Sequence, residues 1–175
     1  MVTIPNSIKQ ILLQVKNPAR YIGGEYGSKE LSGFDSSKLN TVLSFPDLYQ
    51  IGMSNRAVQI IYALVNGMDG AACERVFCPD TDLEVLLTEN SIPLFSLESG
   101  TPVKDFDLLA FSVGYELAAT NMLQVLSLSD IPLLNSERGE NDPIVIAGGP
   151  AVTNPAPFGS FIDCIYIGEI EGSEN

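Results

Sequence analysis

The sequence predicts a doubly wound α/β fold with one parallel sheet of five strands in the order 2-1-3-4-5. From residue 41 onward, short β-rich runs alternate with stretches of helical periodicity, which is typical of parallel βαβ units. Consecutive parallel strands need right-handed crossovers, and a series of this kind most often closes in the order of flavodoxin-like folds. We expect strands at residues 41–45, 71–77, 107–113, 143–148 and 164–168.

The segments between these strands predict the helices that cover the sheet. After the first strand, apolar residues recur at helical spacing, and Ser54 or Asn55 is the expected N-cap. After the second strand, Thr81 and Glu84 have the spacing of a capping box. We expect helices at residues 54–68, 81–90 and 116–130, a short extra strand at 92–96, and at most two helical turns at 156–163.

Residues 1–40 are expected to form an N-terminal helical arm outside the sheet, and residues 41–175 the domain itself. Residues 21–37 are too rich in glycine and serine to join the core sheet. The segment before them has the apolar spacing of an amphipathic helix. The apolar positions of this helix are Ile4, Ile8, Ile11, Leu12 and Val15.

Length and composition limit the classes of function. A chain of 175 residues with 45% hydrophobic content has the usual length of one domain with one well-buried core. Its formal net charge of -13 would repel a phosphate backbone, so we expect no direct nucleic-acid binding. No apolar run approaches the roughly 20 residues that span a bilayer, and no secretory signal pattern opens the chain. We therefore expect a cytoplasmic protein without membrane association.

The chain contains no histidine, which excludes Ser-His-Asp and Cys-His catalysis and histidine metal ligands within this polypeptide. Cys73, Cys78 and Cys164 show no Cys-x-x-Cys spacing. They are typical of reduced, mostly buried thiols in a cytosolic protein.

The loops that follow four of the strands should meet at one edge of the sheet, where ligands of doubly wound folds bind. Glycines there would let a backbone approach a ligand closely, and Ser54 near a helix N-terminus could receive a phosphate or another acceptor. The alternative is structural: glycine is common in tight turns, Asp47 can cap its own turn, Tyr49 and Tyr115 can cover the core edge, and Glu116 can complement a helix dipole. The candidate residues are Asp47, Tyr49, Gly52, Ser54, Ser112, Gly114, Tyr115, Glu116, Gly148, Gly149, Pro150, Gly168 and Glu169.

The stretch from Asp47 to Gly52 resembles the Asp-x-His-x-x-Gly motif of cobalamin-binding domains, with Tyr49 in place of the histidine. Ser112 and the pair Gly148-Gly149 match the later serine and double-glycine positions of that family. The resemblance therefore implies cobalamin as the cofactor of residues 41–175.

The chain is similar, over most of residues 21–171, to the N-terminal domains of radical SAM proteins that carry a cobalamin-binding-like module before their barrel. In that architecture the downstream barrel binds a 4Fe-4S cluster and S-adenosylmethionine through a Cys-x-x-x-Cys-x-x-Cys motif, which this chain lacks. The resemblance implies an accessory domain whose partner is that barrel, with no turnover of its own. The motifs are YIGGEYGS, FPDLYQIGMSN, ERVFCPD, LFSLESG, FSVGYEL, IAGGPAVTNP and IGEIE.

Three positions depart from the family pattern. Tyr49, with an ordinary phenol pKa near 10, cannot replace a histidine as a cobalt ligand, so we expect no protein ligand at the cobalt of a bound cobalamin. Gly114 stands where a small apolar residue is usual, and Ile170 interrupts a terminal Gly-Glu-Gly-Glu pattern. The alternative is a cofactor-free structural or substrate-recognition domain of the same lineage.

Overall fold

The computed structural model describes residues 4–29 and 35–170 of the chain. Within them lies one parallel sheet in the order β2-β1-β3-β4-β5, which confirms the predicted fold class. Thr41, in an interior strand, pairs with Cys73 on one side and with Leu108 on the other. The strands are β1 (Leu39–Leu48), β2 (Ala71–Cys78), β3 (Leu108–Ser112), β4 (Ile144–Gly148) and β5 (Cys164–Tyr166).

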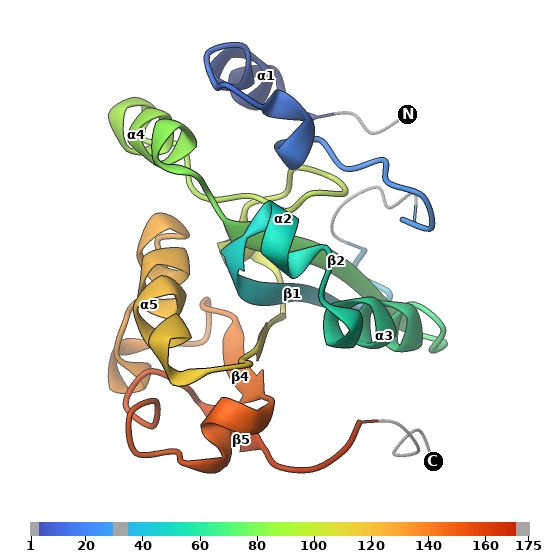
Figure 1. Cartoon of the computed structure of the whole chain (residues 1–175), viewed down its shortest axis with the longest axis vertical. Helices are drawn as coiled ribbons and strands as arrows, with labels where there is room; N and C mark the ends of the chain where they lie inside the picture. Colours follow the sequence, from blue (N-terminus) through green and yellow to red (C-terminus); the bar gives the residue numbers. More distant parts are fainter. Residues whose placement is uncertain (1–3, 30–34, 171–175) are drawn as a thin grey trace.

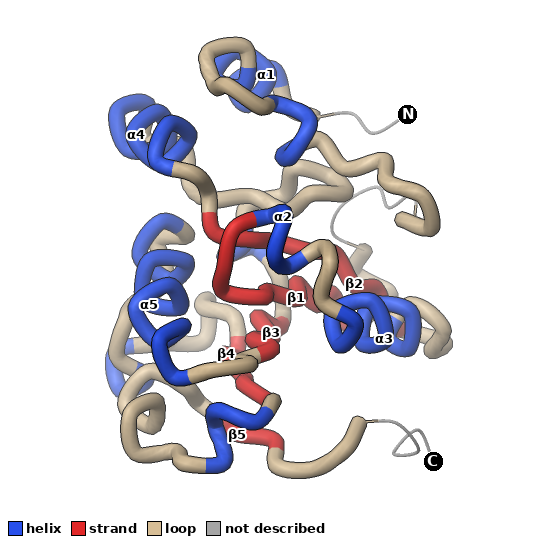
Figure 2. Tube along the Cα trace, in the orientation of Figure 1, coloured by secondary structure: helices blue, strands red, loops and turns tan. Residues whose placement is uncertain are grey.

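Helices cover both faces of this sheet (Figure 1). Figure 2 shows the strands passing between α3 on one side and α4 and α5 on the other. The α-helices are α1 (Asn6–Leu12), α2 (Tyr49–Gly52), α3 (Arg56–Val65), α4 (Thr81–Asn90) and α5 (Ala119–Leu128). The 3-10 helices are η1 (Pro18–Tyr21), η2 (Val103–Asp105), η3 (Glu116–Ala118), η4 (Asn135–Glu137) and η5 (Pro150–Thr153).

Two hydrophobic clusters fill the space between the helices and the sheet. Successive side chains of β1 point to opposite faces, so Val42 packs in the larger cluster, on the side of α4 and α5, and Leu43 in the smaller one, beneath α3. Both residues are almost fully buried. Because the sheet is covered on both faces, its strands have the near-continuous apolar sequences typical of parallel sheets.

The N-terminal arm lies outside the sheet, as expected, and its apolar side chains are part of the larger cluster. The five apolar positions predicted for its helix are all buried there, alongside residues of α4 and α5. β1 begins at Leu39, so the last two residues assigned to the arm belong to the sheet. Residues 30–34 of the glycine- and serine-rich stretch lie outside the described residues.

Local caps explain where the crossover helices begin. The Asn55 side chain accepts hydrogen bonds from the backbone N–H groups of Ala57 and Val58, which confirms it as the N-cap of α3. The predicted capping box of Thr81 and Glu84 is wrong. Asp80 is the N-cap of α4 instead, and its carboxylate accepts from the Thr81 N–H at 2.9 Å, so the preceding acidic residue has taken that role.

Three segments between the main elements differ from their expected form. β1 continues past Pro46 to Leu48 because its register with β2 shifts there, and an irregularity of this kind tolerates the missing N–H of proline. The extra strand expected at 92–96 is reduced to a single antiparallel bridge between Phe95 and Pro102. The short crossover at 156–163 consists mainly of turns.

Candidate functional site

The loops after β1, β3, β4 and β5 lie at the same edge of the sheet because all strands are parallel. We call this the carboxyl edge. Across it, the Tyr115 hydroxyl donates a hydrogen bond to the Asp47 carboxylate, which also accepts from its neighbouring Leu48 N–H at 2.7 Å. The bond to Asp47 raises the pKa of Tyr115 to about 12. Asp47 therefore bonds to its own neighbouring backbone and also joins the end of β1 to the loop after β3.

The end of β3 lies beside the end of β4, where Ser112 pairs in register with Gly148. Ser112 is buried, whereas Gly114 and Glu116 are exposed. Glu116 occupies the first turn of η3, the position expected of a charge that complements a helix N-terminus. A Cβ added at Gly114 would meet only the Phe45 ring, at 3.8 Å, so there is room for a larger group at this position.

The double glycine after β4 has two different roles. Gly149 has a φ of 110°, and a Cβ added there would lie 2.5 Å from the Val113 carbonyl oxygen, so this residue must be glycine for the loop to pack against β3. A Cβ at Gly148 would meet its nearest neighbour, in Tyr166, at 3.7 Å, which is an ordinary contact. Pro150 follows as the first residue of η5. Packing thus explains the glycine at position 149, whereas the contacts around position 148 leave space for a side chain.

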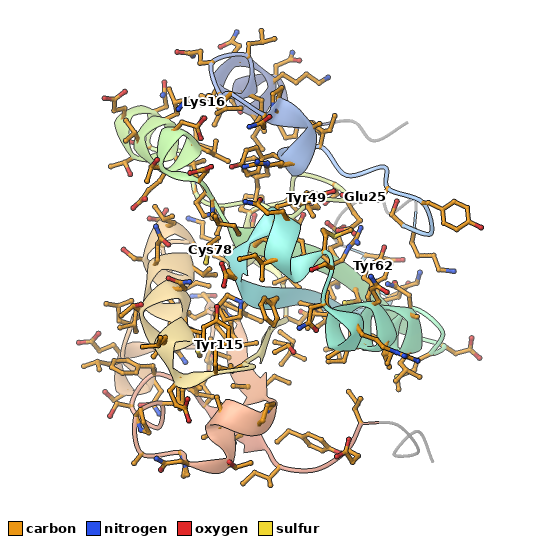
Figure 3. All side chains as sticks on the ribbon, viewed as in Figure 1. Lys16, Glu25, Tyr49, Tyr62, Cys78 and Tyr115 are labelled. Carbon is orange, nitrogen blue, oxygen red and sulfur yellow. The ribbon has the colours of Figure 1, made fainter. Side chains whose placement is uncertain are left out.

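Tyr49, the first residue after β1, points toward the N-terminal arm. Tyr49 donates to the Glu25 carboxylate at 2.8 Å, and its ring meets the Phe77 ring edge-on. Burial and the bond to Glu25 raise the pKa of Tyr49 to about 12. Figure 3 shows Tyr49 beside Glu25 and well apart from Tyr115. The Tyr49 hydroxyl therefore bonds to the arm, whereas the Asp47 carboxylate bonds to Tyr115.

Gly52 and Ser54, in the same loop, also make local contacts. Gly52 is buried, and an added Cβ would collide with the Phe77 ring, so its absence lets α2 pack against β2. The Ser54 hydroxyl donates to the Ile51 carbonyl at 2.8 Å, at the end of α2. Both residues shape the loop that carries Asp47.

After β5, Gly168 and Glu169 are exposed at the end of the same edge. The Tyr166 hydroxyl donates to the backbone carbonyl of Glu169 at 2.8 Å, which folds this segment back on the strand. The structure thus places both residues at the carboxyl edge, at its β5 end.

Large apolar side chains are exposed along the carboxyl edge. Leu117 after β3 is 84% exposed and Ile167 after β5 is 66% exposed. Exposed apolar residues that gather in one region are typical of an interaction surface. We call this set the edge patch, and it consists of Ile51, Tyr115, Leu117, Tyr166 and Ile167.

A family model described as radical SAM proteins, N-terminal, matches residues 57–174. The chain belongs to this family. The match covers β2 to β5 and the candidate residues from Ser112 to Glu169, whereas the β1 loop with Asp47 precedes it. No curated protein and no solved structure matches the chain.

The family description places this radical SAM N-terminal domain ahead of a further domain in the full proteins. Within residues 4–29 and 35–170, no helix is long and apolar enough to cross a membrane. In the same residues, no three His, Cys, Asp or Glu side chains gather in a way that could hold a metal ion.

Sequence reasoning missed a buried charged cluster in this radical SAM N-terminal domain. Arg75 in β2 forms ion pairs with Glu98, at 2.6 Å, and with Glu25 of the arm, at 2.9 Å. Burial raises the pKa of the Glu98 carboxyl, although Arg75 opposes the shift. The available signal was two adjacent charges, Glu74 and Arg75, inside an otherwise apolar strand, because buried charges require partners.

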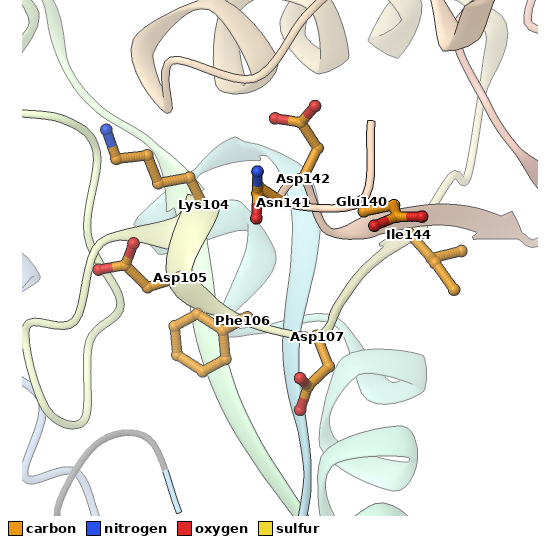
Figure 4. Close-up of a pocket in the computed structure, with 8 residues that line it drawn as sticks. All are labelled: Lys104, Asp105, Phe106, Asp107, Glu140, Asn141, Asp142 and Ile144. Carbon is orange, nitrogen blue, oxygen red and sulfur yellow. The ribbon is translucent and has the colours of Figure 1, made fainter. Parts of the chain in front are cut away.

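A hollow of about 620 Å³ lies at the opposite edge of the domain, where β3 and β4 begin. Figure 4 shows the residues that line it. Asp107 in this hollow accepts from the Asn40 N–H and side-chain amide, so it fixes the start of β1. The hollow therefore does not coincide with the predicted site, and its lining is Lys104, Asp105, Phe106, Asp107, Glu140, Asn141, Asp142 and Ile144.

Proposed function

We propose that this domain is the accessory domain of a radical SAM enzyme and that its carboxyl edge receives a cobalamin-type corrinoid, which the downstream barrel covers. The observation that supports this proposal is the edge patch, which lies at the same edge of the sheet as Asp47, Ser112 and Gly148 at the ends of β1, β3 and β4. An exposed apolar surface beside open glycine positions suits a large flat ring with a polar rim. The barrel would cover the other face of the ring.

The donor groups of the site do not fit cobalt ligation by the protein. The Tyr49 hydroxyl is bound to Glu25, and its raised pKa of about 12 keeps it a neutral phenol. The residues that fit are those able to hold a ring without ligating its metal: Gly114 offers space, Tyr115 and Leu117 offer apolar surface, and Ser112 offers a hydroxyl. A bound corrinoid would supply cobalt-centred group transfer to the enzyme.

A second candidate is a cofactor-free domain that docks on the barrel or helps to recognise its substrate. Asp47 and Tyr49 favour this candidate because both already have hydrogen-bond partners within the domain. Gly52 and Gly149 favour it too, since packing alone explains them. The two candidates share the edge patch as a docking surface and differ in whether a ligand lies on it.

Titration of hydroxocobalamin separates the two candidates. We would follow the visible spectrum and the heat of binding for this chain and for the same domain joined to its radical SAM barrel. The joined protein should bind more tightly, because a ligand covered on one face only must still offset its lost freedom of motion. Gly114→Trp should weaken binding to the joined protein by about tenfold or more, since it fills the open position.

Gly139→Trp is the matched control, because Gly139 precedes β4, away from the carboxyl edge, and an added Cβ there meets nothing within 4 Å. This variant should bind hydroxocobalamin like the unmodified protein. Absence of binding by both proteins would contradict the corrinoid proposal and support the cofactor-free domain. A spectrum that showed phenolate at the cobalt would refute the role assigned to Tyr49.

A further inference from the structure

The N-terminal arm is bound to the sheet through a compact charged cluster. Arg75 Nε donates to Glu98 Oε1 at 2.6 Å, and Arg75 Nη2 donates to Glu25 Oε2 at 2.9 Å. The side chains of Arg75 and Glu98 are 7% and 1% exposed, and that of Glu25 is 19% exposed. The guanidinium also lies over the Tyr62 ring, 4.5 Å from its centre. Glu25 is thus the member of this cluster that comes from the arm.

The same carboxylate reaches the first loop of the candidate site. Its other oxygen, Glu25 Oε1, accepts from the Tyr49 hydroxyl at the start of α2 (Figure 3). At the end of α2, the Met53 thioether accepts from Arg75 Nη1 at 3.1 Å. Both ends of this short helix are therefore tied to the pair of Glu25 and Arg75.

The segment that is fixed in this way consists of the end of β1, from Asp47, and of α2, and we call it the β1–α2 loop. Asp47 precedes Tyr49 by two residues. Its carboxylate accepts a hydrogen bond from the Tyr115 hydroxyl across the carboxyl edge. A chain of contacts thus runs from Glu25 through Tyr49 to the loop that carries Asp47. Four-residue helices have little stability of their own, so external contacts must determine where α2 lies.

We propose that Glu25 is a positioning residue of the candidate site: through Tyr49 it fixes the β1–α2 loop, and with it the place of Asp47 at the carboxyl edge. The arm is then a structural component of the site through Glu25. The meaning of this role for ligand binding rests on the proposed function, whereas the coupling of arm and loop does not.

Cys78 allows the coupling to be measured without any ligand. It is the partner of Leu48 in the sheet register, it is 4% exposed, and its Sγ lies 3.7 Å from the Asn121 carbonyl. Movement of the β1–α2 loop should uncover this thiol. Cys73 in the middle of β2 is fully buried beneath α3 and reports wider unfolding, and the exposed Cys164 reports the activity of the reagent.

The experiment is timed alkylation of the whole chain with N-ethylmaleimide, with each cysteine quantified by peptide mass spectrometry. Glu25→Gln keeps the size of the side chain and removes its charge. It should raise the rate at Cys78 by about tenfold, as expected for the loss of a charge-assisted hydrogen bond, and leave the rate at Cys73 unchanged. Tyr49→Phe should have a similar effect. The double variant should add little to either one, because both act on the same contact.

Val145→Ala is the control, since it removes volume from the core in β4. It should raise the rates at Cys73 and Cys78 by the same factor. If Glu25→Gln also raised both by one factor, or raised neither, Glu25 would have only a general structural role and the proposal would be overturned.

The hydroxocobalamin affinity of the domain joined to its barrel provides the second measurement. Glu25→Gln should weaken it by about the same factor by which it exposes Cys78. If the unmodified joined protein binds no hydroxocobalamin, the corrinoid proposal fails, and the alkylation rates still decide the coupling of arm and loop.

Discussion

The hydroxyl groups of Tyr49 and Tyr115 both donate to carboxylates. Tyr49 donates to Glu25 of the arm, and Tyr115 donates to Asp47 at the end of β1. These bonds satisfy the groups that a ligand would otherwise meet. They also keep both phenols protonated, because a nearby carboxylate disfavours phenolate. At the scale of single residues, both phenols are therefore neutral and hydrogen-bonded.

The phenols of Tyr49 and Tyr115 should ionise near pH 12, because their pKa values are raised from the ordinary value of 10.0 to about 12. The folded-state pKa is raised, so the stability that these groups contribute is present below pH 10 and is lost as the pH rises toward 12. Tyrosinate absorbance, recorded within seconds of a pH jump while the native circular dichroism persists, checks this. Tyr115→Phe should remove one phenol from the step near pH 12. Unchanged amplitude in that variant would contradict the assignment.

At the scale of elements, close approach of backbones determines the shape of the carboxyl edge. The loop after β4 passes so near β3 that the Ala151 N–H donates to the Val113 carbonyl at 3.2 Å. Gly149 makes this approach possible through its positive φ and its missing side chain. The loop after β1 depends in a comparable way on Gly52 beneath Phe77.

Gly149→Ala should destabilise the fold by about 2 kcal/mol or more, because the new Cβ both clashes with Val113 and strains the backbone. Its neighbour provides the control, since Gly148→Ala introduces only ordinary contacts and should change the free energy of unfolding by about 0.5 kcal/mol at most. Urea denaturation measures both values. Equal effects at the two positions would show that the approach of the loop to β3 is not what requires glycine.

The elements that were predicted correctly have local signals in the sequence. Alternating β-rich and helical runs predicted the strand order, and Asn55 predicted the start of α3. Contacts between distant segments explain what was missed. Tyr49 turns to the arm because Glu25 is there, and Arg75 is tolerated in β2 because Glu98 pairs with it. No local pattern contains either partner. The sequence could therefore place the candidate residues at the ends of strands, but it could not predict the orientation of Tyr49.

At the scale of the whole molecule, the arm and the sheet share one core. Ile11 in α1 is 2% exposed and belongs to the larger cluster, and α1 contacts α4, although an appended arm could have been dispensable. The arm also lies along the edge of β2, where a Cβ at Gly23 would touch the Leu97 carbonyl. The family match begins only at residue 57, yet the fold as described includes the segment before it.

Ile11→Ala should lower the free energy of unfolding by about 2–4 kcal/mol, as for other large-to-small changes in a well-packed core. Leu13→Ala is the control in the same segment, because Leu13 is 85% exposed and its loss should cost about 0.5 kcal/mol or less. Thermal and urea unfolding provide the measurement. A loss at Ile11 as small as that at Leu13 would show that the arm is not part of the cooperative unit.

The parallel order of the sheet also affects how the chain reaches its folded state. Thr41 pairs with Cys73 and with Leu108, so both strands that pair with β1 are distant from it in the chain. Each pairing requires the closure of a long loop before its contacts can form, and such topologies fold more slowly than helical domains of similar length. Until β2 and β3 arrive, the apolar face of β1 is open to association with other chains. During synthesis, this strand is therefore the segment of the domain that most depends on rapid completion of the fold.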